Sequence, residues 1–365
     1  MKKKKIVFII GQLDIGGIES WLYDFVKKTY KQNEYTFIVD KKHVGFYEPD
    51  LVKLGCKVIH IASSKNKAAY TWGLLRVLSS NNFDISHSHV SFTNGLVAFL
   101  AALCRIPKRI SHSHSNRTSE VKNKKLLKKT AIKIQILMAN LFSTHRIAVS
   151  DESAKCHYNS INSVEIIPCG KDFSPILDFK KIYTPDEFGF KDEDIILGTV
   201  GRLEVVKNHV FLIDLLANLK NKNTKLFIIG DGTQYHQLQK KITESELTDR
   251  VFILRGTTDV LRIMRDVMHV FLFPSHHEGL GLAAIEAQAA GLPVIASKNV
   301  PGAVDITDNI WHLETQSTND WIEKVEVLIS QLRMYSKKHV PDEIINSHFS
   351  IDHNVNKISR IYNEK

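Results

Sequence analysis

The sequence predicts an α/β protein built from two doubly wound, Rossmann-like domains. Three observations favour this fold class. Short apolar runs of strand length alternate with stretches of helix length from residue 6 onward. This alternation stops after Gly170 and begins again at Ile195. The chain also has 365 residues, more than one average domain contains.

The first half begins with a continuous β-branched and apolar run at 6–10, which is typical of a buried parallel strand. The same pattern recurs through the rest of this half. The expected strands cover 6–10, 35–39, 57–61, 85–89, 109–114 and 146–150, and the expected helices cover 18–30, 46–54, 69–79, 94–103 and about 121–136.

The second half repeats the rhythm after 171–194, which is rich in Asp, Lys and Pro and is expected to be a linker. Its expected strands cover 195–200, 225–229, 251–254, 270–274 and, as the last one, 294–296. Its expected helices cover 210–219, 234–245, 258–265 and 283–290, with further helices from residue 319 on. We therefore expect domains at 1–170 and 171–345. A C-terminal helix in 346–365 is expected to pack back towards the first domain.

The charge is unevenly distributed along the chain. Residues 1–170 hold 26 lysines and arginines against 12 aspartates and glutamates, whereas residues 171–365 hold 23 against 27. A basic half predicts an anionic partner, which could be a membrane surface, nucleic acid or a phosphorylated substrate. The four scattered cysteines, the lack of a C-x-x-C pair and the lack of a long apolar run predict a cytoplasmic protein without a spanning helix.

The stretch at 121–136 alternates leucines and isoleucines with lysines in helical fashion. A basic amphipathic helix is typical of an element that lies on an anionic membrane surface. The same pattern also fits a helix packed on the sheet with a solvated lysine face. The sequence leaves both interpretations open.

The segment His276-His277-Glu278-Gly279-Leu280-Gly281-Leu282 joins a buried strand to a helix that ends before Gly291. The free N–H groups and the positive dipole end of such a helix attract anions. Glu278 precedes the glycines and Glu286 lies about two turns into the helix, so both can contact one extended ligand.

Glycines and cations follow three other predicted strands. Gly16-Gly17 lie at a turn where the backbone can approach a phosphate closely. Arg202 and Lys207 follow the strand at 195–200, and this pair of cations suits a diphosphate. Gly230-Asp231-Gly232 end the strand at 225–229. The lack of a G-x-G-x-x-G pattern disfavours a nicotinamide cofactor.

Two His-Ser-His triplets, at 87–89 and 112–114, fall at predicted strand ends. Alternate residues of a strand share a face, so each pair could chelate a metal ion. No acidic residue completes a familiar ligand spacing. The favoured interpretation is a single cleft histidine, His112 or His114, that makes a polar contact near the reaction centre.

The order of these motifs resembles that of the retaining GT-B glycosyltransferases, over nearly the whole chain. The most specific part is the Glu278-x7-Glu286 pair, followed by Ala-Gly-Leu-Pro-Val at 290–294. The stretches 201–208, 16–19 and 111–114 are similar to the family's diphosphate loop, glycine loop and histidine stretch. The resemblance implies two Rossmann-like domains that face an interdomain cleft.

The resemblance also implies a role for each motif. Glu286 would bind the nucleotide ribose and Glu278 the sugar, Arg202 and Lys207 would neutralise the leaving diphosphate, and backbone near Gly256 would meet the base. The implied catalytic residues are His112, which we favour over His114, Glu278, Arg202 and Lys207. The implied donor-binding residues are Gly16, Gly17, Arg202, Lys207, Gly256, Glu278, Gly281, Leu282 and Glu286.

The function implied is transfer of a sugar, with retention, from a nucleotide-sugar to a glycan or lipid-linked acceptor in cell-surface polysaccharide synthesis. A UDP-sugar is the favoured donor, with no metal and no other cofactor. We expect an anionic membrane surface as a partner, no nucleic acid, and a peripheral position on the inner face of the cell membrane. The alternatives are a GT-B-fold sugar-nucleotide epimerase and a non-catalytic basic binder of membranes or nucleic acid.

Overall fold

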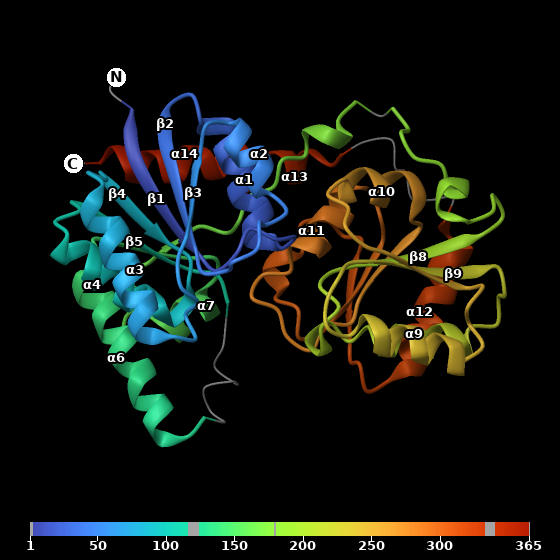
Figure 1. Ribbon diagram of the computed structural model, residues 1–365. Coiled ribbons are helices and arrows are strands. Elements are labelled where there is room, and N and C mark those ends of the chain that lie inside the picture. Colours follow the sequence, from blue (N-terminus) through green and yellow to red (C-terminus); the bar gives the residue numbers. More distant parts are fainter. Residues whose placement is uncertain (1–2, 116–123, 179, 333–339, 365) are drawn as a thin grey trace. The chain divides into compact units, whose positions relative to one another are not determined.

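The computed structural model describes residues 3–115, 124–178, 180–332 and 340–364 (Figure 1). The chain divides into two compact units. Unit 1 contains Met1–Gly170 and Ile351–Lys365, and unit 2 contains Lys171–Ser350.

Unit 1 is built on a parallel sheet with the strand order β3-β2-β1-β4-β5-β6-β7. Its strands are β1 Lys4–Ile10, β2 Asn33–Val39, β3 Lys57–His60, β4 Ile85–Ser88, β5 Lys108–Ser113, β6 His145–Ala148 and β7 Glu165–Ile166. Its helices are α1 Gly17–Thr29, α2 Glu48–Lys53, α3 Lys67–Ser80, α4 Asn94–Leu103, α6 Leu126–Phe142, α7 Asp151–His157 and α14 Ile351–Asn363. The order reverses between β1 and β4, as in a doubly wound sheet.

Helices cover both faces of this sheet because its central strand is apolar on both sides. Val7 and Ile9 of β1 pack with residues of α3 and α4 on one face. On the other face, the ring of Phe8 packs against Phe25 of α1 and His87 of β4. A continuous apolar run thus predicts the buried central strand correctly.

The C-terminal helix α14 belongs to unit 1 and packs on α1 (Figure 1). The buried Asn354 connects three segments that are far apart in sequence. Its side-chain oxygen accepts a hydrogen bond from Trp21 Nε1 at 2.6 Å, and its amide nitrogen donates to the carbonyl of Pro168. Because all three groups are buried, loss of this amide would leave polar groups without partners.

Unit 2 repeats the architecture with a parallel sheet in the order β10-β9-β8-β11-β12-β13. Its strands are β8 Ile195–Val200, β9 Thr224–Ile229, β10 Val251–Leu254, β11 Val270–Phe273, β12 Val294–Ser297 and β13 Ile310–Leu313. Its helices are α8 His209–Asn218, α9 Tyr235–Glu244, α10 Val260–Val267, α11 Leu282–Ala289, α12 Thr318–Ser330 and α13 Asp342–Ile345. Here the order reverses between β8 and β11.

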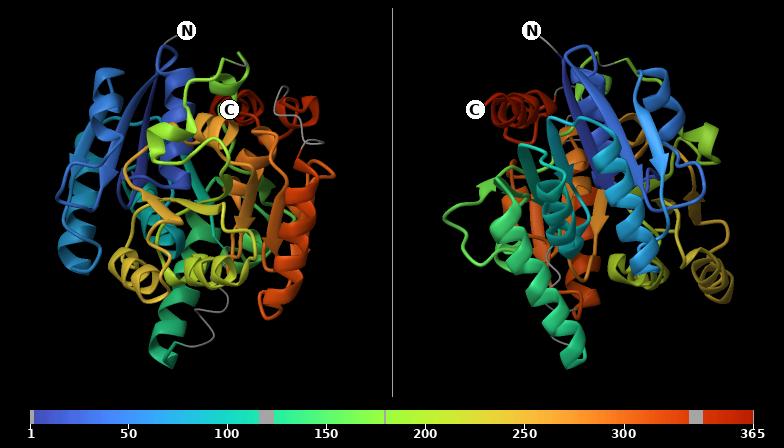
Figure 2. Two further views of the ribbon diagram at one scale, coloured as in Figure 1. Left: turned by 90° about the vertical axis from the view of Figure 1, so that its right-hand side faces the viewer. Right: turned by 60° about the vertical axis from the view of Figure 1, so that its left-hand side comes forward.

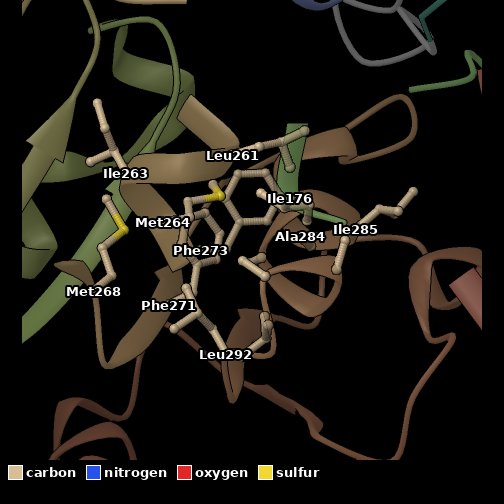
Figure 3. Packing of buried hydrophobic residues seen from close by; sticks show 14 of the residues in the cluster. Ile176, Leu261, Ile263, Met264, Met268, Phe271, Phe273, Ala284, Ile285 and Leu292 are labelled. Atoms are coloured by element: carbon tan, nitrogen blue, oxygen red, sulfur yellow. The ribbon is translucent and has the colours of Figure 1, made fainter. Parts of the chain in front are cut away.

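Each face of the unit 2 sheet has its own apolar core. Leu197, Leu226 and Leu272 pack with residues of α8, α9 and α12 on one face. On the other, Phe271 and Phe273 of β11 lie among side chains of α10 and α11 (Figure 3). The second core fixes α11, which carries Glu286, against the strand that leads to Glu278.

The structure differs from the sequence expectations in two places in unit 2. The sequence predicted no strand after 294–296, but β13 pairs with β12 at the edge of the sheet. It was missed because all four of its residues are only partly buried, so its apolar pattern is weak. The expected linker at 171–194 is part of the core, since Phe173, Ile176 and Phe190 are buried in it.

Helix α6 is the most exposed long helix of unit 1, and it extends beyond the sheet in both views of Figure 2. It runs from Leu126 to Phe142, further than expected, and residues 121–123 of the expected helix lie outside the described residues. Its contacts within the unit are mainly with α4, and Ala139 is its buried residue. Within the described ranges, no helix is both long and apolar enough to cross a membrane.

Candidate functional site

The candidate site lies where the strand order of unit 2 reverses. Strands β8 and β11 are neighbours, but the chain leaves β8 towards β9 on one side and leaves β11 towards β12 on the other. In open parallel sheets, ligands bind outside the carboxyl ends of the strands at such a reversal. The two loops that follow β8 and β11 carry Arg202, Lys207 and Glu278.

Backbone and side-chain hydrogen bonds connect these two loops directly. The amide of His276 donates to the carbonyl of Val206 at 2.8 Å, and Asn208 Nδ2 donates to the carbonyl of Pro274 at 3.3 Å. Asn208 has a φ of 57°, a left-handed conformation that asparagine adopts more readily than most residues. The loop after β8 is therefore held on the loop after β11.

Lys207 and Glu278 form an ion pair at this junction, with Nζ 2.6 Å from Oε1. Both side chains are largely buried, with 19% and 10% of their surface exposed. The ammonium group also lies over the ring of Phe273, 5.2 Å from its centroid. The sequence predicted both residues for one site, and the structure brings them into contact.

Helix α11 begins at the carboxyl side of the glycine turn. Its N-cap, Gly281, has a φ of 96°, which a residue with a side chain adopts only with strain. The first N–H groups of any helix lack intrahelical acceptors, so the amides at Gly281 and Leu282 suit an anion. Glu286 projects from the next turn, and its Oε1 lies 3.2 Å from Nζ of Lys171.

The loops after β8 and β9 pack with almost no space between their backbones. A Cβ atom added to Gly230 would lie 1.9 Å from the carbonyl oxygen of Gly201. Beside them, Arg202 is exposed, and no side-chain partner is recorded for it among the described residues. Arg202 is thus available to an anion next to Lys207.

The strand ends on the other side of β8 hold a second charged group. Arg255 donates to Asp231 at 2.9 Å and stacks on the ring of Tyr235, 4.4 Å from its centroid. This contact lowers the pKa of the Asp231 carboxyl. Gly256 follows with a φ of 75° and open space around its Cα. The base contact implied for Gly256 stays a prediction.

In unit 1, Gly16 and Gly17 lie at the start of α1, as the sequence predicts. Gly16 is the N-cap, with extended backbone, and Gly17 is the first helical residue. The carboxylate of Glu19 folds back over Gly16, since a Cβ atom there would lie 2.3 Å from Glu19 Oε2. A negative group thus already occupies the space next to this helix end.

The two His-Ser-His triplets form a stacked cluster inside unit 1. The centroids of neighbouring rings lie 4.0–5.4 Å apart, next to Trp21. Nε2 of His87 lies 3.3 Å from Nδ1 of His112, and Nδ1 of His89 lies 2.8 Å from Nε2 of His114. Burial, together with the neighbouring imidazoles, lowers the pKa of all four well below the ordinary value.

This geometry bears on the expected cleft histidine. His112 is fully buried, and its Nε2 has no hydrogen-bond partner among the described residues. His114 is partly exposed, but Nδ1 contacts Cys169 Sγ at 3.4 Å and Nε2 contacts His89. The unpartnered Nε2 of His112 is shielded from solvent and both nitrogens of His114 have partners, so a donor contact through either side chain stays a prediction.

Possible metal ligands come together at one place among the described residues, where one nitrogen from each of His87, His89 and His112 lies within 4.8 Å of the others. Tetrahedral zinc requires nitrogen–nitrogen distances of about 3.4 Å, and the 3.3 Å between Nε2 of His87 and Nδ1 of His112 is close to this value. The acidic run Asp192-Glu193-Asp194 lies at the amino end of β8, away from the candidate site, and Asp194 pairs with Lys225.

Sequence reasoning missed Lys171 as a member of the site. It follows Gly170 at the start of unit 2, and no motif spacing relates it to Glu286. The sequence signal was a single cation in a segment interpreted as linker.

With this geometry in place, comparison with known proteins shows which family the chain resembles. Residues 182–338, which hold every predicted site residue of unit 2, match the family model for glycosyl transferases group 1. The chain is related to the group 1 glycosyltransferases.

Relatives and solved structures resemble this chain over most or nearly all of its length. The capsular polysaccharide biosynthesis glycosyltransferase CapH of Staphylococcus aureus is 26% identical and covers 99% of each chain. The UDP-Gal:alpha-D-GlcNAc-diphosphoundecaprenol alpha-1,3-galactosyltransferase of Escherichia coli is 27% identical over 79% of this chain and 77% of its own. The crystal structure of Anabaena HepE in complex with UDP and glucose superposes with a TM-score of 0.79, at 19% identity and 98% coverage of both chains. This likeness confirms the GT-B fold predicted from the sequence.

Proposed function

We propose that this glycosyltransferase transfers a sugar from a UDP-sugar to a glycan or lipid-linked acceptor in the synthesis of a cell-surface polysaccharide. The observation that carries the proposal is the Lys207–Glu278 ion pair at the strand reversal of unit 2. Glu278 lies in the glycine turn just before the start of α11. The names of the relatives support the rest, because the Escherichia coli enzyme uses UDP-Gal and CapH acts in capsule synthesis.

The chemistry of sugar transfer explains why cations gather here. The bond between C1 of the sugar and the phosphate oxygen breaks, and negative charge develops on the departing diphosphate. Fixed cations and helix N–H groups that face this charge lower the barrier. Arg202 and Lys207 can supply the cations, and the amides of Gly281 and Leu282 can supply the N–H groups. The acceptor hydroxyl forms the new bond to C1, and its proton passes to the leaving phosphate.

We assign positioning roles to the two glutamates. Glu286 binds the ribose hydroxyls and Glu278 orients the sugar, while backbone at Gly256 contacts the base. Glu278 is not a general base in this scheme, because Lys207 Nζ lies 2.6 Å from its Oε1 and the pair holds the carboxylate in place. The acceptor attacks on the face that the diphosphate leaves, so the anomeric configuration is retained.

The acceptor side of the proposal rests on helix α6. Leu127, Ile134, Leu137 and Leu141 lie on one stripe of the helix and are 86%, 51%, 49% and 67% exposed. Lysines flank the stripe in its first half. An exposed apolar stripe beside cations suits the surface of an anionic membrane, where a lipid-linked acceptor is found. We therefore place the working enzyme on such a surface.

A binding panel tests the donor site. Isothermal titration with UDP, GDP and ADP should give binding for UDP, and a thermal shift should follow occupancy by the UDP-sugar. Lys207→Met and Glu286→Gln should each weaken binding of UDP by roughly tenfold or more, because each removes a charged hydrogen-bond partner.

The matched control is Lys225→Met. This lysine is also largely buried and pairs with Asp194 at 3.8 Å, but it lies at the start of β9, at the opposite end of the strand from the site. It should bind UDP as the wild type does. Unchanged affinity in both site variants would overturn the assignment of the donor site.

A further inference from the structure

Both glutamates of the candidate donor site are paired with a lysine. The Lys207–Glu278 pair joins two residues of the predicted motifs. The second pair joins Glu286 to Lys171, with Nζ 3.2 Å from Oε1 and with 14% and 13% of the two side chains exposed. Lys171 lies outside every motif, so its contact with Glu286 requires its own explanation.

The backbone of Lys171 is fixed independently of its side chain. Its amide donates to the carbonyl of Phe349 at 2.7 Å, and Lys171 forms a parallel β-bridge with Ser350. Loss of the ammonium group would leave these backbone contacts in place. A substitution of the side chain therefore tests the contacts of the ammonium group while the backbone of Lys171 stays held.

The ion pair reduces the electrostatic repulsion between Glu286 and an anionic ligand. A nucleoside diphosphate is an anion, and two largely buried carboxylates next to it would repel it. Lys207 balances Glu278, and Lys171 balances Glu286. Burial of an unpaired carboxylate would also favour its neutral form, which accepts fewer hydrogen bonds from hydroxyl groups.

The geometry leaves room for a ligand on Glu286. An ionised carboxylate has about four acceptor positions. Lys171 approaches Oε1, and no other side-chain partner of Glu286 is recorded among the described residues. The remaining positions can accept the two hydroxyls of a ribose while Lys171 stays bound. The lysine thus orients the carboxylate without competing with the sugar.

We propose that Lys171 is a positioning residue of the donor site, which holds the Glu286 carboxylate oriented for a ribose diol and so selects ribonucleotides over deoxyribonucleotides. This inference rests on the proposed function, since Glu286 must contact the ribose of the donor. It adds to that function a residue that determines recognition of the nucleotide sugar.

The test compares two ligands across three variants. Isothermal titration measures the Kd of UDP and of 2′-deoxy-UDP for the wild type, Lys171→Met, Lys171→Arg and the control Lys225→Met. The wild type should prefer UDP by roughly tenfold or more, as expected for a hydrogen bond to a charged acceptor. Lys171→Met should lose most of this preference, because binding of UDP weakens while binding of 2′-deoxy-UDP changes little. Lys171→Arg and Lys225→Met should keep it.

The outcomes separate the two proposals. If Lys171 had a purely structural role, Lys171→Met would lower the affinity for both ligands by the same factor. An unchanged preference in Lys171→Met therefore overturns the inference and leaves the proposed function intact. A wild type that binds both nucleotides equally well also overturns it. A wild type that binds neither nucleotide overturns the proposed function, and the inference with it.

Discussion

At the scale of single residues, a substitution of Gly230 gives a sharp prediction. Gly230 packs against the backbone of the loop after β8, which carries Arg202 and Lys207. In Gly230→Ala the new methyl group would meet the carbonyl oxygen of Gly201, which cannot rotate away. One of the two loops must shift, at a cost of roughly 1–3 kcal/mol in the free energy of unfolding. Because the shift moves Arg202 and Lys207, UDP affinity should fall as well.

Urea unfolding and UDP titration measure these two effects. Gly302→Ala is the control in the same unit, since its Cβ would meet only the flexible carboxylate of Asp305 at 3.6 Å. It should change neither quantity appreciably. Full UDP affinity in Gly230→Ala would show that the loop accommodates the methyl group without moving its cations.

The residues of the site differ in how far the sequence predicts them. Lys207 and Glu278 lie in motifs directly after strands, so strand prediction alone places them at one sheet edge. Lys171 contacts Glu286 because of the path that the chain takes at the start of unit 2. No local sequence pattern predicts that path. His112 shows a third case. Its strand was predicted, but the ring lies among Trp21 and other histidines because side-chain packing decides which face of a strand-end residue is covered.

At the scale of elements, helix α6 supports a prediction about membranes. Leu127→Ser and Leu141→Ser together should reduce flotation with anionic vesicles by tenfold or more, since each exposed leucine that inserts contributes about 1–2 kcal/mol. Both side chains are already exposed, so the free energy of unfolding should change by less than about 0.5 kcal/mol. Removal of the charges in Lys128→Gln and Lys129→Gln should weaken binding by about 1 kcal/mol each, and less at high salt.

The control for α6 is Val327→Ser, a partly exposed apolar residue on α12 of unit 2. It should float as the wild type does. Equal flotation of the leucine variants and the wild type would assign α6 to a role other than membrane docking. Neutral vesicles provide a second comparison, because the lysines contribute only on an anionic surface.

The elements themselves were predictable where they are buried on both faces. β1, β8, β9 and β11 are centred on apolar runs. β8, β9 and β11 lie within one residue of their predicted bounds, and β1 begins two residues before its predicted start. The edge strand β13 lacks such a run because one side faces solvent. Residues 171–194 were interpreted from their polar composition, although three apolar side chains among them complete the core of unit 2. Local composition thus predicts a linker wrongly where a few buried apolar side chains hold an irregular segment in the core.

At the scale of the whole molecule, buried histidines make stability depend on pH. Burial, with a smaller effect of Lys207, lowers the pKa of His209 in unit 2 to about 4. Unit 1 holds four further histidines whose pKa values burial lowers well below the ordinary one, His87, His89, His112 and His114. All five are neutral in the folded chain and have an ordinary pKa of about 6.5 in the unfolded chain.

The direction of the pH dependence follows from this difference in pKa between the folded and the unfolded chain. Between pH 6.5 and 4 the unfolded chain takes up protons that the folded chain does not, so the free energy of unfolding is full above about pH 6.5 and falls as the pH is lowered. His209 alone accounts for about 3 kcal/mol of this loss, which levels off near pH 4. Unit 1, with four such histidines, should lose more than unit 2 and should unfold first.

Urea unfolding at several pH values from 7.5 to 4.5, with pulse hydrogen exchange at one fixed pH to locate the open unit, measures this order. His209→Gln should flatten the pH dependence of unit 2 and leave that of unit 1 unchanged. The exposed His348→Gln should alter neither. Early opening of unit 2 would mean that the histidine cluster of unit 1 accepts protons without unfolding. Its rings would then have to separate, because stacked imidazoles this close cannot all carry charge in an apolar interior.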